Sequence, residues 1–194
     1  IVGDVKSVLR EFTKEIEACP CDEWLKKVQA AKKEAPLRGE PRTDFVEPRA
    51  FMRDLSAMME DDAILTADVG QNQIWAANNF NTKEGRFLTS GGMGTMGYAL
   101  PAAIGAKLAK PKRQVVAVCG DGSFQMSMCE LATANQNRVP LKLVVMRNKF
   151  LGMVKELQDN LYQGRHVATP LNGDPDIVKL VQAYGIKAVF AQNN

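Results

Sequence analysis

The alternation of apolar runs with amphipathic stretches along the chain is typical of a parallel sheet covered by helices. The strongest β-branched runs cover Val115 to Val118 and Leu141 to Met146, and both predict buried strands. Residues 124–136 lie between these runs and have a helical pattern. The pattern predicts further helices over residues 48–59, 73–78, 98–108 and 176–184 and from about residue 151, and further strands over residues 64–67, 87–89 and 188–190. We therefore expect an α/β fold, an open parallel sheet with helices on both faces.

The N-terminal part of the chain predicts helices but no strand. Apolar residues recur at helical spacing within residues 1–17, and Asp4 is placed to cap that helix. Residues 22–33 predict a second amphipathic helix, and proline and glycine residues then interrupt regular structure over residues 34–43. Two such helices have no core of their own, so we expect them to lie on the main domain or to pack against a neighbour. The expected organisation is a short helical segment with a linker over residues 1–43, then an α/β domain over residues 44–194.

The composition is that of an ordinary globular protein. Of the 194 residues, 45% are hydrophobic and 24% are charged, which allows one domain with a small extra segment. The net charge of +3 is small and not clustered, so we expect no nucleic-acid partner. No apolar run is long enough to span a bilayer and no signal peptide opens the chain, so we expect no membrane association. The chain starts without an initiator methionine, which indicates a piece of a longer protein.

The four cysteines predict neither a disulfide nor a metal site. Cys19 and Cys21 are separated by one proline, which is too close for an easy disulfide, and a second cysteine pair for a zinc site is missing. Cys119 lies in a predicted strand and Cys129 in the helix after it. We expect reduced, structural thiols in a cytoplasmic protein.

Polar residues follow the two strongest strands. Gly120, Asp121 and Gly122 end the first strand, where two glycines let the backbone turn tightly and approach a ligand. The start of the next helix offers N–H groups to an anion such as a diphosphate. The second strand delivers Asn148 to the same edge of the sheet, so Asp121 and Asn148 are expected to meet there. One carboxylate and one amide oxygen beside a diphosphate predict a site for Mg²⁺.

These residues carry a resemblance to thiamine-diphosphate enzymes. The motif Gly120-Asp121-Gly122, followed after residues 123–147 by Asn148, matches the signature of that family. Residues 90–98, 100–106, 130–134 and 151–154 resemble the acetolactate synthase family, also called acetohydroxyacid synthase. The resemblance implies that residues 1–43 are the tail of a middle domain. It also implies that residues 44–194 are a thiamine-diphosphate-binding domain, truncated at its C-terminus.

The resemblance implies thiamine diphosphate and Mg²⁺ as cofactors and suggests roles for individual residues. The implied metal ligands are Asp121, Asn148 and the backbone carbonyl of Phe150. The implied catalytic residues are Met96, which would prop the cofactor in a bent, reactive shape, and Met153, which would lie near its thiazolium ring. The residues implied to bind the cofactor are Val69, Gly70, Gln71, Asn72, Gly94, Met96, Gly120, Asp121, Gly122, Ser123, Asn148, Phe150, Gly152 and Met153.

Plainer structural roles compete with some of these assignments. Asp121 and Asn148 are residue types that are common in turns and loops, and Met96 is a type that often fills cores. The only histidine, His166, lies in a polar stretch next to an arginine. That setting favours a surface residue over a catalytic base.

The chain departs from the family pattern at three positions that bear on the site. Asn72 stands where family members often have His, Lys149 where they often have a second Asn, and Leu157 where many have Trp. Asn72 can still donate a hydrogen bond to an anion but carries no charge. Leu157 alters the substrate channel, so the second substrate stays open.

The function implied by the resemblance is a carboligase reaction on small 2-oxo acids. Pyruvate loses CO₂, and its two-carbon unit joins a second 2-oxo acid. In this family a glutamate from a partner subunit activates the cofactor, and no stretch here resembles the domain that carries it. We expect a homodimer or tetramer and an inactive chain by itself, while FAD and a small regulatory subunit are left open. The alternatives are another thiamine-diphosphate 2-oxo acid decarboxylase or carboligase, or a non-catalytic cofactor-binding relative.

Overall fold

A computed structural model describes residues 2–34, 45–173 and 175–192 of the chain. The chain forms two compact units, Ile1–Glu40 and Pro41–Asn194. Most of the linker expected over residues 34–43 lies outside the described residues, so the boundary at residue 43 stays a prediction. Among the helices of the described residues, none combines the length and apolar character that a bilayer crossing requires.

The first unit contains two helices among its described residues, α1 (Val5–Glu15) and α2 (Asp22–Glu34). Asp4 caps α1 as expected, because its carboxylate accepts a hydrogen bond of 2.9 Å from the backbone N–H of Ser7. Bonds from the backbone and hydroxyl of Ser7 hold the pKa of the Asp4 carboxyl below its usual value. The apolar residues of α1 form a stripe, and none of them is buried. This helix therefore has no core of its own, as the pattern predicted.

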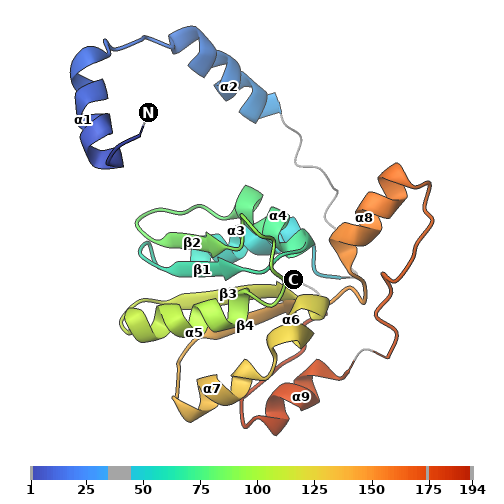
Figure 1. The fold of residues 1–194 in the computed structure, drawn as a ribbon. Helices are drawn as coiled ribbons and strands as arrows, with labels where there is room; N and C mark the ends of the chain where they lie inside the picture. The colour runs from blue at the N-terminus through green and yellow to red at the C-terminus, as the bar shows by residue number, and fades with distance from the viewer. Residues whose placement is uncertain (1, 35–44, 174, 193–194) are drawn as a thin grey trace. The chain divides into compact units, whose positions relative to one another are not determined.

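The second unit is built on a four-stranded parallel sheet with the order β2-β1-β3-β4 (Figure 1). The strands are β1 (Ile64–Ala67), β2 (Arg86–Thr89), β3 (Val115–Gly120) and β4 (Lys142–Met146). After β1 the chain adds β2 on one side, then returns to place β3 on the other side of β1. The loops after β1 and β3 therefore leave the sheet toward opposite faces and open a crevice between them. Ligands of open α/β sheets bind in such crevices.

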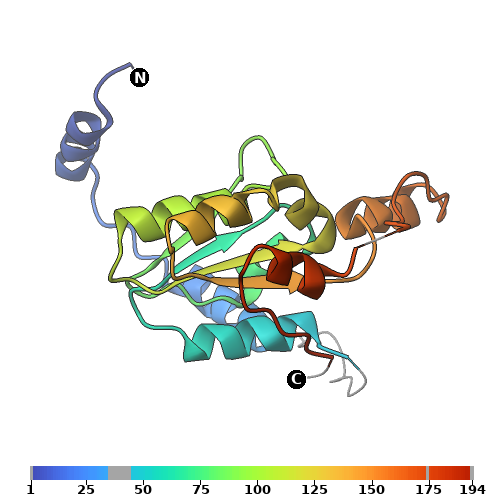
Figure 2. The same ribbon diagram turned by 90° about the horizontal axis from the view of Figure 1, so that it is seen from below.

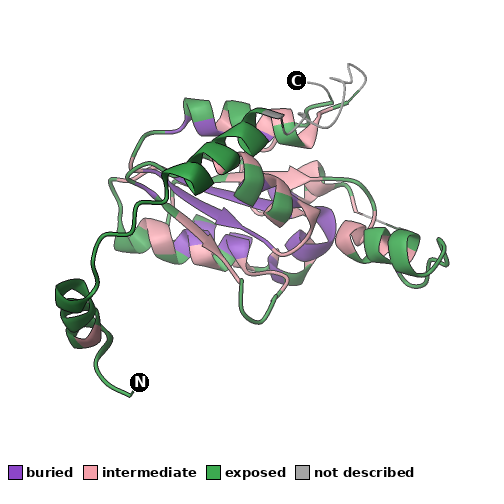
Figure 3. Ribbon diagram, turned by 90° about the horizontal axis from the view of Figure 1, so that it is seen from above, coloured by how far each residue is buried: buried purple, intermediate pink, exposed green. Residues whose placement is uncertain are grey.

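Two hydrophobic layers cover the two faces of the sheet, because successive strand residues point to opposite sides. On one face α3 (Pro48–Met58) and α4 (Gln71–Asn79) pack over Leu65, Val116 and Val118. On the other face α5 (Ala99–Ala109), α6 (Asp121–Ser127), α7 (Glu130–Gln136) and α9 (Ile177–Ala183) pack over Ile64, Val115 and Ala117. Figure 2 shows α5 and α7 on one side of the sheet and α3 on the other, and Figure 3 shows the buried residues concentrated in the strands. The predicted α/β fold is confirmed.

Three elements differ from the prediction. The helix expected over residues 124–136 is two helices, because bonds of the i to i−3 type at Met128 and Cys129 tighten the chain between α6 and α7. The first of them begins at Asp121, and α4 begins at Gln71 rather than at residue 73. The strand predicted over residues 188–190 is wrong. Ala188 packs against the core, but the Val189 side chain is 92% exposed, and an apolar run without a pairing strand does not form a sheet.

Candidate functional site

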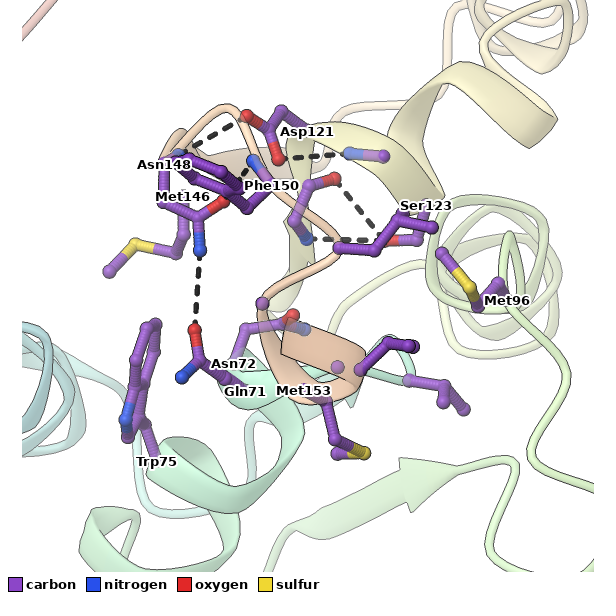
Figure 4. Close-up of a pocket in the computed structure, with 17 residues that line it drawn as sticks. Gln71, Asn72, Trp75, Met96, Asp121, Ser123, Met146, Asn148, Phe150 and Met153 are labelled. Atoms are coloured by element: carbon purple, nitrogen blue, oxygen red, sulfur yellow. Dashed lines mark hydrogen bonds between the residues drawn. The ribbon is translucent and has the colours of Figure 1, made fainter. Parts of the chain in front are cut away.

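A pocket lies at the carboxyl ends of the strands, where the sheet topology places the crevice (Figure 4). All the residues implied to bind the cofactor line it, except Gly94, which lies in an exposed turn. Its lining also includes four residues that the sequence analysis did not propose, Trp75, Met146, Leu151 and Val154. Trp75 follows Gln71 by one helical turn of α4, so helical spacing could have found it. Met146 is the last residue of β4 and precedes the loop of Asn148.

Asp121 organises the loop that follows β4. Its side chain is 1% exposed, and its Oδ2 atom accepts hydrogen bonds from the backbone N–H groups of Asn148 (3.2 Å) and Lys149 (2.6 Å). Lys149 has a φ of 61°, a left-handed conformation that helps to turn both N–H groups toward Asp121. The ends of β3 and β4 therefore meet at this carboxylate, as the parallel arrangement predicted.

A chain of side-chain hydrogen bonds crosses the pocket from Asn148 to α8 (Gly152–Leu161). The Asn148 amide oxygen accepts from the backbone N–H of Phe150 at 2.9 Å, and its Nδ2 donates to Gln71 Oε1 at 3.2 Å. Gln71 Nε2 in turn donates to Glu156 Oε2 at 3.1 Å. Gly152 is required here, because a Cβ atom at this position would lie 2.1 Å from Gln71 Oε1. Figure 4 shows the Asn148–Gln71 bond on the side of the pocket opposite Met96.

Asn72 turns its donors away from the pocket. Its side chain is buried, and Nδ2 donates to the backbone oxygens of Asp68 (2.8 Å) and Val118 (3.4 Å). These bonds tie the start of α4 to the ends of β1 and β3. In this structure Asn72 lines the pocket as a brace between strand ends, while Gln71 is the neighbouring side chain that reaches across it.

Ser123 also bonds to the local backbone. Its hydroxyl accepts from the N–H of Gly120 at 3.1 Å and donates to the Gly120 carbonyl at 3.2 Å. These bonds close the turn between β3 and α6 and hold Asp121 and Gly122 at the pocket wall. Ser123 therefore shapes the turn whether or not a ligand is bound.

Met96 and Met153 contribute apolar surface at a distance from the polar group. Both side chains are half-buried, and Figure 4 shows them apart from Asp121 and Asn148. The Met96 Cε atom lies 3.8 Å from the position that a Cβ on Gly122 would take. The apolar surface of Met96 and Met153 thus lies apart from the polar group of Asp121 and Asn148.

The electrostatics of the pocket centre on carboxylates. Among the described residues that line it, Asp121 alone carries a charge. Behind it, burial raises the pKa of the Cys119 thiol well above its usual value, and the negative charges of Asp68 and Asp121 raise it further. Cys119 is therefore a protonated thiol, whose sulfur lies 3.6 Å from the Val144 carbonyl, and it is not a nucleophile.

A metal ion at this site would depend on mixed oxygen ligands. In the part of the chain that the structure describes, no three His, Cys, Asp or Glu side chains gather in a way that could hold an ion. The Asp121 carboxylate instead bonds to the small loop after β4, which carries the Asn148 amide oxygen and the backbone of Phe150. His166 does not line the pocket; its ring nitrogen lies 2.5 Å from Asp159 on the exposed side of α8.

The fold and the pocket define a cofactor-binding α/β domain with an acidic oxygen site at the switch point of its sheet. Residues 68–194 match the family described as thiamine pyrophosphate enzyme, C-terminal TPP binding domain, and the chain belongs to this family. It is 40% identical over 193 residues to the acetolactate synthase isozyme 3 large subunit of Escherichia coli (strain K12), an alignment that covers 95% of this chain and 34% of the relative. The chain thus spans about a third of the length of this curated relative.

Two further relatives have the same description. The chain is 41% identical over 202 residues to a probable acetolactate synthase large subunit of Methanocaldococcus jannaschii, with 97% of this chain and 34% of the relative covered. It is 40% identical over 196 residues to the acetolactate synthase large subunit of Lactococcus lactis subsp. lactis, with 100% of this chain and 34% of the relative covered. The residues that line the pocket run from Val69 to Val154, and all of them fall within the part of the chain matched to the family.

Proposed function

We propose that this chain is the diphosphate- and Mg²⁺-binding domain of an acetolactate-synthase-like carboligase. The enzyme would decarboxylate pyruvate and join the two-carbon unit to a second 2-oxo acid. The observation that carries the proposal is the meeting of Asp121 and Asn148 at the switch point of the sheet, in a pocket that Met96 and Met153 line with apolar surface. The similarity to three acetolactate synthase large subunits supports it.

The donor set fits a hard cation bound to a diphosphate. Mg²⁺ prefers oxygen ligands and is usually held by one or two carboxylates together with ligand phosphates and water. Asp121 supplies one carboxylate, Asn148 an amide oxygen and Phe150 a backbone carbonyl. The backbone N–H groups that bond to Asp121 orient it, as hydrogen bonds around a metal ligand commonly do. These residues would hold the charged end of the cofactor.

The apolar lining of the pocket fits an aromatic ring system. Met96, Met146, Met153 and Trp75 supply polarizable or flat apolar surface around it. When bound, thiamine diphosphate supplies the carbon nucleophile and the electron sink for decarboxylation. The role of Met96 and Met153 is to support the rings and exclude water from them. Gln71 and Ser123 also line the pocket and would contact the diphosphate.

The remaining parts of the proposed enzyme lie beyond these residues. A glutamate from a partner subunit would complete the site, so we propose a homodimer or a higher oligomer in the cytoplasm. All four cysteines are free in the structure, which fits a reducing compartment. The relatives are named large subunits, and a small regulatory subunit is part of the proposal on that ground. FAD binding is a separate question for the rest of the protein.

Titration of the native protein with thiamine diphosphate tests this proposal, with and without Mg²⁺. Trp75 lines the pocket, so its fluorescence reports binding, and Trp24→Phe removes the only other tryptophan of this chain. We expect saturable, Mg²⁺-dependent quenching. Acetolactate formed from pyruvate alone would support the carboligase reaction. Absence of cofactor binding would overturn the proposal, and binding with a different product from 2-oxo acids would place the protein among other thiamine-diphosphate decarboxylases or carboligases.

A further inference from the structure

A second buried carboxylate, Asp68, lies directly after β1 and outside the pocket lining. Its side chain is 1% exposed, and it accepts three backbone hydrogen bonds. Oδ1 accepts from the N–H groups of Val69 (2.9 Å) and Gly97 (2.9 Å), and Oδ2 accepts from the N–H of Ala99 (2.8 Å). A charge buried this deeply is stable only when it is well hydrogen-bonded, and these bonds meet that need.

Thr66 adds another hydrogen bond to the segment that Asp68 holds. It lies two residues before Asp68, so the two side chains point to the same face of β1. The Thr66 side chain is fully buried, and its hydroxyl donates to the backbone oxygen of Ala99 at 2.9 Å. β1 and the residue after it therefore hold Ala99 by both its N–H and its C=O group.

The anchored segment is the one that carries Met96. Gly97 follows Met96 directly, has a φ of 86°, and would place a Cβ 3.2 Å from the Met126 Cβ. The turn is thus confined between Asp68 on one side and α6 on the other. Ala99 is the first residue of α5, whose N-cap residue Tyr98 makes no side-chain capping bond. The negative charge of Asp68 at this helix start takes over that role and is favourable there.

Asp68 also begins the loop that lines the opposite side of the pocket. Val69, Gly70, Gln71 and Asn72 follow it directly, and the Asp68 backbone oxygen accepts from the Asn72 amide. Asp68 therefore bonds through its side chain to the Met96 turn and to Val69, and through its backbone oxygen to Asn72.

We propose that Asp68 is a positioning residue that sets the place of Met96 relative to the loop of residues 69–72. Asp68 contacts neither cofactor nor substrate. It fixes the distance between Met96, which would support the bent cofactor, and the loop of residues 69–72, which would bind the diphosphate. A bent cofactor must fit this distance. The consequence for the reaction rests on the proposed function, whereas the anchoring of the turn is a property of the fold.

Amide hydrogen exchange of the cofactor-free native protein tests the anchoring. In Asp68→Asn one of the two acceptor atoms becomes an NH₂ group that faces a backbone N–H. We expect exchange at Gly97 and Ala99 to be about tenfold faster or more, and in Thr66→Val, which removes one bond, to be about threefold faster at Ala99. The control Asp62→Asn removes an exposed carboxylate that pairs with Arg113, and should leave this exchange unchanged. Unchanged exchange in Asp68→Asn overturns the proposal; if that variant does not fold, unchanged exchange in Thr66→Val does so.

Kinetics of the same variants test the consequence for the reaction. We expect kcat of Asp68→Asn to fall about tenfold or more while thiamine-diphosphate affinity changes less than about threefold. The reason is that Met96 moves, whereas the proposed metal ligands Asp121 and Asn148 keep their positions. Faster exchange with an unchanged kcat overturns the link between Asp68 and the reaction. Faster exchange in a native protein that binds no thiamine diphosphate overturns the proposed function and leaves the anchoring intact. A kcat loss matched by an equal loss of affinity overturns the positioning role.

Discussion

Asp121 determines both the charge of the pocket and the geometry of the loop after β4. Its carboxylate is the charged group among the described lining residues, and it orders the backbone of Asn148 and Lys149. A residue with both roles cannot be replaced by its amide without loss, because an NH₂ group would face the N–H donors that now point at oxygen.

We expect Asp121→Asn to abolish Mg²⁺-dependent cofactor binding and to lower the free energy of unfolding by about 1–3 kcal/mol, the usual range for a lost buried acceptor. Isothermal titration with thiamine diphosphate and Mg²⁺ measures the first effect, and urea unfolding measures the second. The control is Asp54→Asn, which changes an exposed carboxylate on α3 and should alter neither quantity. Unaltered cofactor affinity in Asp121→Asn would contradict the proposal that Asp121 is a metal ligand.

Gly152 is limited by space rather than by backbone conformation. An added methyl group would lie 2.1 Å from Gln71 Oε1 and 2.7 Å from Asn148 Nδ2, so both side chains must leave their present positions. These are the mobile ends of side chains, so Gly152→Ala should keep most of its stability and lose about tenfold or more in cofactor affinity, or about 1.4 kcal/mol. Gly91→Ala is the matched control, because a Cβ there meets nothing within 4 Å. Equal affinities of the two variants would contradict a role for Gln71 and Asn148 in binding.

Met96 and Met93 offer a matched pair of residues on one segment. Met96 lines the pocket, whereas the Met93 side chain is 90% exposed. We expect Met96→Ala to reduce kcat by about tenfold or more with little change in cofactor affinity, because it removes a support for the rings and leaves the anchor in place. Met93→Ala should leave both kcat and cofactor affinity unchanged. A Met96→Ala variant that loses only thermal stability would show that Met96 is a core residue without a part in the reaction.

At the scale of elements, α8 is joined to the segment after it by two side chains. Gln158 exchanges two hydrogen bonds with the backbone of Val167, at 3.1 and 3.0 Å. Asp159 bonds to Lys155 at 2.8 Å on α8 and to His166 at 2.5 Å. Bonds to Lys155, and then to His166, hold the pKa of the Asp159 carboxyl below its usual value.

This lowered pKa has a definite sign. A carboxyl whose pKa is lower in the folded state stabilises the fold above its unfolded pKa, and that contribution is lost as the pH falls through the folded pKa. We expect an NMR titration to place the Asp159 midpoint below 3.8, its ordinary value, and Lys155→Met to raise it more than His166→Asn does. Because all three groups are partly exposed, solvent will keep the effect small. An Asp159 midpoint at or above 3.8 would contradict this arrangement.

At the scale of the whole molecule, the chain is similar to about a third of each relative that it matches. Its pocket is formed by segments at the carboxyl ends of the strands. It brings the proposed metal ligands Asp121 and Asn148 into one site with Met96. In the proposed enzyme the activating glutamate comes from a partner subunit, so the 194-residue chain would hold the cofactor without the residue that activates it.

We expect the purified 194-residue chain to consume no pyruvate above a cofactor-only blank, because half a site lacks the proton relay and admits water. The Escherichia coli relative at full length, assayed in parallel, is the positive control. Size measurement in solution should show self-association of the chain, since surfaces that face a partner would be exposed. Measurable pyruvate consumption by the chain alone would contradict the shared-site proposal.

The order and type of most elements followed from local pattern, because apolar spacing decides which face of a segment can be buried. The runs predicted from Val115 and from Leu141 form β3 (Val115–Gly120) and β4 (Lys142–Met146), and Pro48 starts a helix as expected. Parallel strands have their carboxyl ends at one edge, so the meeting of Asp121 with the Asn148 loop also followed from the sequence. The strand expected at residues 188–190 did not form, because local apolar character does not supply a pairing partner.

The direction of each polar side chain was decided by contacts between residues far apart in the chain. Asn72 has the chemistry to bind an anion, yet its amide donates to the carbonyl of Val118, a residue brought near only by the pairing of β1 with β3. Asp68 directly follows the strand that the sequence predicted over residues 64–67, but its bonds to Gly97 and Ala99 depend on how α5 crosses that strand end. Periodicity records which residues are buried, whereas hydrogen bonds of about 3 Å depend on the tertiary arrangement that brings donor and acceptor together.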